Sequence, residues 1–380
     1  MTKPGMSHRE RVVTAMRRQI PDQVPFDLTH GFTAPRLERF RQETGKDDPN
    51  EYFGGDARVV DIAPPRFVHD YSRYFENFPP HATVDEWGIG HLPTSSDDPW
   101  HAHLEGFIYP MRKLRTREEA LDYPLPDVEA EYRFTDLAPQ IARFHTQGLA
   151  VIGFLEMTIF EVAWYMRSME LLLMDFVDNP EFAGTLLDRI TAKRKVQAAR
   201  YAELGVDLIC LGDDVGTQQG MLMSVPMWRR WLKPRLARVI AAAKRVRPDV
   251  LINYHSDGNM GAVIPELIEI GVDILNPVQP ECLDPAELKR RYGEHLSFWG
   301  TIGIQHTLPF GTPQEVREEV RTRIATVGAG GGLLIGPTHI VEPEVPLENI
   351  VAMVEAVKEY GAYAQARLGG ALATRERLVS

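Results

Sequence analysis

Short apolar runs recur through the second half of the chain, and each is followed by a segment with apolar positions at helical spacing. The runs cover residues 149–154, 206–214, 249–256, 272–279, 296–303 and 331–339. Most of them are apolar on both faces, which is typical of parallel strands covered by helices. A further run near residue 24, VPFDL, predicts an early strand. We therefore expect an α/β fold, and we favour a (β/α)8 TIM barrel over a doubly wound sheet because the number of strands approaches eight.

The first part of the chain is less regular. Its many prolines and the segments DEWGIGHL and GFIYPMRKL predict an irregular or hairpin-bearing elaboration over about residues 30–145. No break in composition and no repeat of 20 to 50 residues marks a second domain. The sequence therefore predicts one elaborated barrel domain over residues 1–380.

Composition and charge exclude several classes of partner. The net charge of −11 argues against a nucleic-acid partner, because phosphate binding needs a concentrated basic surface. The most apolar stretch, residues 154–177, is interrupted by charged residues, so it predicts a helix with one buried face and no membrane span. The N-terminus has no apolar signal core, and two cysteines support no disulfide framework. We expect a cytoplasmic protein.

Polar side chains follow the predicted strands at their carboxyl ends, the face at which barrels of this type build active sites. These residues are Asp213 and Asp214, His255 and Asp257, Asn276 and Gln279, Thr301 and Gln305, and His339. Any one of them is explained as well by capping a helix or by satisfying loop backbone. Because five strand ends carry such groups, we expect a functional site there.

His255 and Asp257 are the first metal-ligand candidates. Two residues apart on an extended backbone, their side chains point to the same side, and His339 follows the last predicted strand. Two imidazoles and a carboxylate suit zinc, iron or manganese. In the alternative reading, His255 is a satisfied core histidine and Asp257 caps a helix that starts near Gly258. Whether Glu281 or Cys282 adds a ligand stays open, since a lone cysteine is more often a small buried apolar residue.

Carboxylates are the candidate catalytic groups. Asp213 and Asp214 stand together at a strand end, where one of them can have a raised pKa and act as acid or base. The alternative is that one forms a salt bridge and the other caps a helix. We expect at least one functional carboxylate in this pair, with Asp214 or Glu156 as the residue that positions a substrate or handles a proton. The glycines of GAGGG precede a strand, so they predict a tight turn and not a phosphate-binding loop.

Four longer motifs resemble a known superfamily: LGDDVGTQQGMLMSVPMWRRWLKP, GVDILNPVQPECLDPAELKRRYG, LSFWGTIGIQHTLPFGTPQEVREEV and GGGLLIGPTHIVEPEVPLENI. Over about residues 150–362 the chain is similar to the uroporphyrinogen decarboxylase superfamily, in its branch of decarboxylase-like proteins and corrinoid-dependent methyltransferases. The resemblance implies a (β/α)8 barrel, often a homodimer. The chain lacks the early arginine-rich stretch of the porphyrinogen decarboxylases, which makes uroporphyrinogen an improbable substrate.

The zinc methyltransferases of this superfamily carry His-x-Cys at a strand end and a second cysteine before the PxxxPLEN stretch. The matching positions here are His255, Asp257 and His339. Harder ligands make a more Lewis-acidic metal, which suits an oxygen substrate better than a thiol.

Three hypotheses follow. The first is a zinc-dependent methyltransferase that moves a methyl group between a small oxygenated or aromatic substrate and a corrinoid (cobalamin) on a partner protein, with substrate contacts at Asn276, Gln279, Trp299 and Gln305. The second is a decarboxylase or lyase on a small organic acid. The third is a binding protein without chemistry, which the convergence of titratable groups on one face disfavours.

Overall fold

The structure is a computed structural model of the 380-residue chain and describes residues 5–92 and 106–363. Its residues form two compact units. Unit 1 comprises Met1–Val59, Arg143–Val151 and Asp273–Ser380, and unit 2 comprises Val60–Ala142 and Ile152–Val272. Three elements run across a boundary between these ranges: β1 (Ala57–Val60), α5 (Leu137–Thr146) and β5 (Ala150–Leu155).

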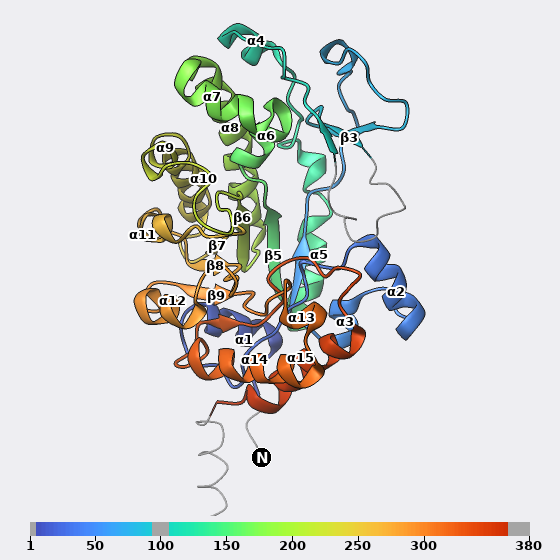
Figure 1. The fold of residues 1–380 in the computed structure, drawn as a ribbon, viewed down its shortest axis with the longest axis vertical. Coiled ribbons are helices and arrows are strands. Elements are labelled where there is room, and N and C mark those ends of the chain that lie inside the picture. Colours follow the sequence, from blue (N-terminus) through green and yellow to red (C-terminus); the bar gives the residue numbers. More distant parts are fainter. Residues whose placement is uncertain (1–4, 93–105, 364–380) are drawn as a thin grey trace, which may run out of the picture. The chain divides into compact units, whose positions relative to one another are not determined.

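Unit 2 contains the strand that precedes Asp214 and the strand that ends at His255 and precedes Asp257 (Figure 1). β6 (Leu208–Gly212) runs parallel to β7 (Leu251–His255), and the end of β5 runs parallel to β6. Every residue of β6 and β7 is buried, as expected for parallel strands covered on both faces. The long helix α8 (Pro180–Leu204) packs against α10 (Lys233–Val246). The other helices are α4 (Arg117–Asp122), α6 (Phe160–Arg167), α7 (Met169–Asp178), α9 (Val225–Trp231) and α11 (Ile264–Glu269), with 3-10 turns at Ser72–Tyr74, Glu131–Arg133 and Gly261–Val263.

Unit 1 contains the last strands of the chain. β8 (Ile274–Asn276) and β9 (Ser297–Trp299) are parallel, and β9 pairs in the same sense with β10 (Leu333–Leu334). α14 (Pro313–Thr326) packs against α15 (Leu347–Tyr360). α14 begins with a capping box between Thr312 and Glu315 and has Pro313 in its first turn. The other helices are α1 (His8–Met16), α2 (Ala34–Thr44), α3 (Pro49–Phe53), α12 (Pro285–Tyr292) and α13 (Thr307–Phe310).

The early strand predicted near residue 24 is very short. The backbone N–H of Asp27 donates to the carbonyl of Ile335 (2.8 Å), and the N–H of Ile335 donates to Pro25 (3.0 Å). On the other side, the N–H of Asp56 donates to the carbonyl of Phe26 (3.0 Å). The segment therefore lies between the residue that follows β10 and the residue that precedes β1, and it supplies an eighth strand position.

The seven assigned strands have the order β1-β5-β6-β7-β8-β9-β10 in one sheet. Strands alternate with helices from β5 onward, and each predicted apolar run overlaps one assigned strand. The predicted α/β fold of the (β/α)8 type is confirmed. A single domain over residues 1–380 stays a prediction.

The predicted elaboration contains a hairpin, as the sequence indicates. β2 (Thr83–Val84), β3 (Gly90–Leu92) and β4 (Gly106–Ile108) form a separate antiparallel sheet. The prediction missed that residues 30–145 also contain β1 of the main sheet. A strand of four residues carries too little periodicity to be recognised in sequence.

The prediction of one helix over residues 154–177 is wrong. Phe154 and Leu155 end β5, and the helical part breaks between α6 and α7 at Ser168, which has a φ of 77°. The Ser168 hydroxyl accepts a hydrogen bond from the N–H of Leu171 (3.3 Å) and so caps α7. Because Ser168 starts a new helix inside a largely apolar stretch, the hydropathy of the sequence gives no sign of the break. Among the described residues, no helix combines the length and hydropathy that a membrane crossing requires.

Candidate functional site

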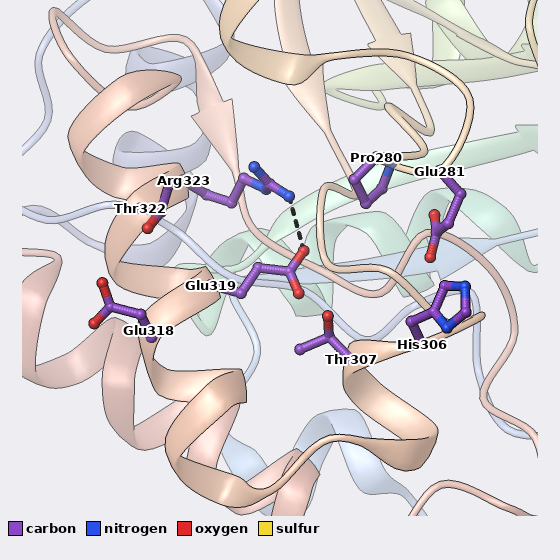
Figure 2. A pocket seen from close by; sticks show the side chains of 8 residues that line it. All are labelled: Pro280, Glu281, His306, Thr307, Glu318, Glu319, Thr322 and Arg323. Atoms are coloured by element: carbon purple, nitrogen blue, oxygen red, sulfur yellow. Dashed lines mark hydrogen bonds and ion pairs between the residues drawn. The ribbon is translucent and has the colours of Figure 1, made fainter.

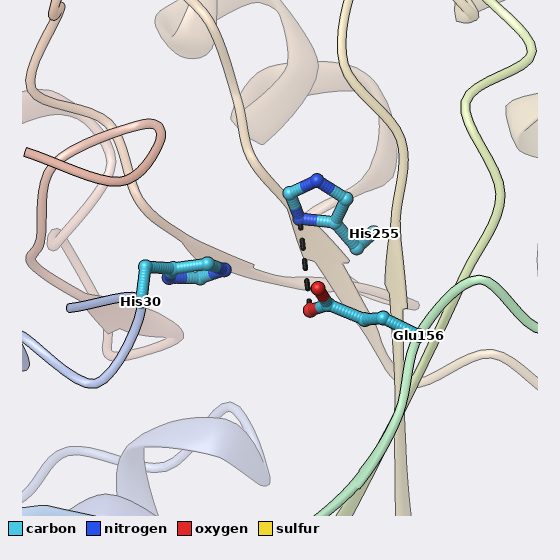
Figure 3. A group of neighbouring side chains, drawn as sticks. All are labelled: His30, Glu156 and His255. Carbon is cyan, nitrogen blue, oxygen red and sulfur yellow. Dashed lines mark ion pairs between the residues drawn. The ribbon is translucent and has the colours of Figure 1, made fainter. Parts of the chain in front are cut away.

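Three neighbouring strands bring Glu156 and His255 together over a glycine. Leu155 of β5 stands opposite Leu211 of β6, and Gly212 stands opposite His255 of β7. A Cβ at Gly212 would lie 2.7 Å from the Cβ of His255, so only glycine leaves this space open. Glu156, the residue after β5, reaches across it, and its Oε1 lies 3.8 Å from His255 Nδ1 (Figure 3).

Asp214, His255 and Asp257 form a group with metal-ligand geometry within unit 2. Each offers one ligand atom, and these atoms all lie within 4.8 Å of one another. His255 Nε2 is 3.8 Å from Asp257 Oδ1, while the N–H of Asp257 donates to Asp214 Oδ1 (2.7 Å). An imidazole with two carboxylates fits a divalent metal such as zinc, iron or manganese. The same-side placement that the sequence predicts for His255 and Asp257 agrees with this geometry.

Asp257 does not cap the next helix. The 3-10 turn after β7 begins at Gly261 and α11 begins at Ile264, and neither has a side-chain cap. Gly258 has a φ of 77° and packs against Thr217, and the N–H of Asn259 donates to the carbonyl of Thr217 (2.7 Å). The glycine of YHSDGN thus lets the loop after β7 pack closely on the loop after β6, with Asp257 on the side of His255.

The two neighbouring aspartates have different surroundings. Asp213 is almost fully buried, and its carboxylate accepts from the N–H groups of Ile159 (2.9 Å) and Glu161 (3.0 Å), at the start of α6. Burial raises the pKa of Asp213 to about 7. Asp213 therefore holds a helix terminus, and Asp214 is the carboxylate that faces His255.

Glu161 is a buried acid that the sequence analysis did not select. Its Oε2 accepts from the N–H of Asp214 (3.1 Å), and the hydroxyl of Tyr165 donates to its Oε1 (3.1 Å). Burial, and then the charges of Asp214 and Asp213, raise the pKa of Glu161 well above its ordinary value. Glu161 lies in the first turn of α6, where an acidic residue commonly stabilises the helix dipole. No signal in the sequence therefore distinguishes it as a candidate site residue.

A pocket of about 360 Å³ in unit 2 reaches Glu156. It lies at the carboxyl ends of β1 and β5 and is lined by Asp61, Ile62, Pro64, Pro65, Glu86, Trp87, Arg133, Phe154, Leu155, Glu156, Met157, Arg194 and Gln197. Arg133 donates to both oxygens of Glu86 (2.6 and 3.0 Å). Arg194 donates to Gln197 and to the carbonyls of Thr158 and Met157, and its guanidinium lies over the ring of Trp87.

Asp61 is a solvent-exposed acid of this pocket. Desolvation by the surrounding protein raises its pKa, although the hydroxyl of Tyr201 donates to its Oδ1 (3.0 Å). The pocket is therefore lined by polar and apolar side chains together, with carboxyl acceptors at Asp61 and Glu156, while its two guanidinium groups already have protein partners.

The predicted substrate-binding residues lie in unit 1. Asn276, Gln279 and Trp299 are buried, and Asn276 Nδ2 donates to the carbonyl of Trp299 (3.2 Å). Gln305 is exposed. Its N–H donates to Glu281 Oε1 (3.3 Å), and Glu281 lines a separate surface pocket of about 510 Å³ with His306 and Glu319 (Figure 2). A substrate role for these four residues stays a prediction.

The other metal candidates also lie in unit 1. His339 follows β10 and is half-buried, and Cys282 has its Sγ 3.6 Å from Gln279 Oε1. Among the described residues, neither His339 nor Cys282 belongs to the metal-ligand group of Asp214, His255 and Asp257. The role of His339 as a third ligand stays a prediction.

Residues 108–360, more than half of the chain, match the family described as Uroporphyrinogen decarboxylase (URO-D). The chain belongs to this family, which confirms the predicted resemblance.

Individual relatives carry two kinds of name. The methylcobamide:CoM methyltransferase MtaA of Methanosarcina barkeri is 30% identical over 174 residues, 46% of this chain and 48% of that protein. The uroporphyrinogen decarboxylase of Legionella pneumophila (strain Lens) is 25% identical over 230 residues, 59% and 62% of the two chains. The match thus spans about half the length of the methyltransferase relatives.

A solved structure extends the likeness over most of the chain. The structure of a methyltransferase from Methanosarcina mazei has a TM-score of 0.67 at 17% identity and covers 93% of this chain and 99% of that one. The two proteins share a fold.

Proposed function

We propose that this protein is a metal-dependent methyltransferase that moves a methyl group between a small oxygenated or aromatic substrate and a corrinoid carried by a partner protein. The observation that carries this proposal is the group of Asp214, His255 and Asp257, whose ligand atoms lie within 4.8 Å of one another. These residues would hold the metal, zinc by preference. A bound divalent metal would supply Lewis-acid polarisation of the substrate oxygen.

The pocket beside Glu156 supports an oxygenated substrate. Its apolar side chains, among them Trp87 and Phe154, can contact an aromatic or short aliphatic substrate, and the carboxyl groups of Asp61 and Glu156 can accept hydrogen bonds from hydroxyl or phenol groups. When a methyl group leaves an oxygen as a cation, the C–O bonding electrons stay on that oxygen, which must then take up a proton or be held by positive charge. Glu156, which lies outside the proposed metal-ligand group, is the residue proposed to position the substrate and to transfer that proton.

The guanidinium groups bear on the alternative, a decarboxylase or lyase on a small organic acid. Recognition of a substrate carboxylate favours an arginine fork that faces the ligand. Arg133 and Arg194 already donate to Glu86, Gln197 and main-chain carbonyls. The proposal of methyl transfer is therefore preferred.

Metal analysis is the first test. Protein purified without chelator and supplied with Zn²⁺, Fe²⁺ or Mn²⁺ should retain about one equivalent of one metal. Retention of less than about one-tenth of an equivalent of each would contradict the metal site and would reassign its residues to substrate binding.

Methyl transfer is tested with free methylcobalamin as the probe. Protein loaded with the divalent metal should demethylate methylcobalamin when a small phenol or alcohol is present as the methyl acceptor. The reaction is followed by the change in the visible spectrum of the cobalamin and by detection of the methylated acceptor. Release of CO2 from small organic acids without any cobalamin reaction would support the decarboxylase alternative. The family resemblance also supports a homodimer, and a monomer by light scattering at micromolar concentration would count against it.

A further inference from the structure

A buried thiol lies directly beneath the space that Glu156 occupies. Cys210 stands opposite Asn253 in the β6–β7 register, two residues before the pair of Gly212 and His255. Side chains two residues apart on a strand point to the same side, so Cys210 and Asn253 form the layer below His255. Cys210 is 2% exposed and Asn253 is fully buried.

The polar atoms of this layer form a chain of hydrogen bonds. Asn253 Nδ2 donates to Cys210 Sγ (2.7 Å), and the thiol donates to Glu156 Oε1 (2.9 Å). The same Glu156 oxygen lies 3.8 Å from His255 Nδ1. Since a thiol has a single proton and the Asn253 amide occupies an acceptor site on sulfur, the S–H is directed at Glu156.

We propose that Cys210 is a positioning residue that aims the Glu156 carboxylate at His255. The inference rests on the proposed metal site, because it assigns Cys210 a role in orienting groups next to the ligand His255. A carboxylate that accepts a hydrogen bond from below and stands beside an imidazole above has little freedom to turn away. Glu156 would be the partner that orients the ligand His255, and loss of such a partner typically lowers metal affinity about 10- to 100-fold. Cys210 would act on this affinity through Glu156.

The competing explanation is packing alone. Cysteine is one of the most frequently buried residues and often acts as a small apolar side chain. In that case a valine would replace Cys210 without consequence for Glu156, and serine would be the poorer substitute. Positioning predicts the reverse order.

The infrared S–H stretching band tests the contact without any metal. The chain has two cysteines, so Cys282→Ser leaves Cys210 as the single thiol. In metal-free C282S protein, the band should lie at the low frequency of a thiol that donates to a carboxylate, and C282S/E156A should shift it upward to that of a weakly bonded thiol. An unchanged band position would overturn the proposal.

Affinity for Co²⁺, followed by its visible spectrum, tests the consequence. Cys210→Ala and Cys210→Val should each weaken Co²⁺ binding about 10-fold or more, and Cys210→Ser should restore it to within about 3-fold of wild type. Cys282→Ser is the matched control and should leave the affinity unchanged.

Two results with Co²⁺ would also overturn the proposal. One is wild-type affinity in the alanine and valine variants. The other is a sulfur-to-cobalt charge-transfer band that Cys210→Ser removes, since it would make Cys210 a direct ligand. If wild-type protein binds no Co²⁺ at all, the proposed metal site fails, while the infrared shift still decides whether Cys210 holds Glu156.

Discussion

The ends of β6 and β7 in unit 2 and the ends of β8 and β9 in unit 1 carry different kinds of polar groups. In unit 2, the ends of β6 and β7 bear Asp214, His255 and Asp257, with their ligand atoms within 4.8 Å of one another. In unit 1, the ends of β8 and β9 bear Asn276 and Trp299, neutral groups joined by a side-chain to main-chain hydrogen bond. Equivalent positions on parallel strands therefore carry titratable groups in one unit and neutral groups in the other.

Buried acids in both units show what removing a carboxylate from water requires. In unit 2, main-chain N–H groups donate to Asp213, Asp214 and Glu161. In unit 1, the Thr29 N–H and hydroxyl donate to Oδ2 of the buried Asp27. Such donors offset part of the desolvation cost. Burial still raises the pKa of Asp213 to about 7 and that of Asp27 to about 6, so the donors do not offset the whole cost in either unit.

His255→Ala should have the largest effect. Removal of the imidazole from the ligand group should lower zinc affinity by at least about 100-fold and abolish methyl transfer, with the fold unchanged by circular dichroism. The matched substitution His339→Ala tests the predicted third ligand, because an equal loss would support it and unchanged binding would restrict the site to unit 2. Wild-type zinc content in His255→Ala would contradict the metal role of His255.

Asp27→Asn should change the pH dependence of stability. The pKa of Asp27 is raised from 3.8 to about 6, so the folded state holds this proton more tightly than the unfolded chain does. Ionisation of Asp27 therefore lowers the free energy of unfolding as the pH rises through this range, by about 2 to 3 kcal/mol in total. Asp27→Asn should be more stable than wild type at pH 7, and this advantage should disappear near pH 4.

Urea unfolding of both proteins between pH 4 and pH 7 measures the effect. A stability difference that is the same at every pH would show that Asp27 does not titrate in this range.

Asp213→Ala and Asp214→Ala should separate two adjacent aspartates. Asp213 accepts from two N–H groups at the start of α6, so its loss should lower the free energy of unfolding by about 2 kcal/mol. Asp214→Ala should cost less stability and more metal affinity. Denaturant unfolding and Zn²⁺ titration of both variants measure these effects. If Asp213→Ala loses zinc affinity and Asp214→Ala does not, the proposed division, with Asp214 as the metal ligand, is wrong.

Gly212→Ala should have the smallest effect on stability. A Cβ at this position would lie 2.7 Å from both the Cβ and the carbonyl oxygen of His255, so β7 must shift, at about 1 kcal/mol or more. The shift should also weaken metal binding. Gly220→Ala is the matched control in the same unit, because its added Cβ meets nothing within 4 Å. Equal behaviour of the two variants would exclude a role for the open space at Gly212.

Local patterns in the sequence were sufficient for the six strands β5 to β10 and for the placement of His255 and Asp257 on one side. Apolar runs on both faces predict buried parallel strands, and the period of two places His255 and Asp257 on one side of β7. Both features depend only on neighbouring residues, which is why the (β/α)8 class and this pair were predictable.

The division of roles among the acids depended on the tertiary structure. Asp213 and Asp214 are equivalent in sequence, and only the approach of α6 gives Asp213 the two main-chain donors that make it structural. The contact of Cys210 with Glu156 likewise depends on the register of β5 and β6, and the burial of Glu161 depends on how α6 packs beside Asp214. Both contacts join residues more than 40 positions apart in the sequence. Hydrophobic periodicity carries no information about such register, because the same pattern is compatible with many pairings and the packing of whole strands and helices selects one of them.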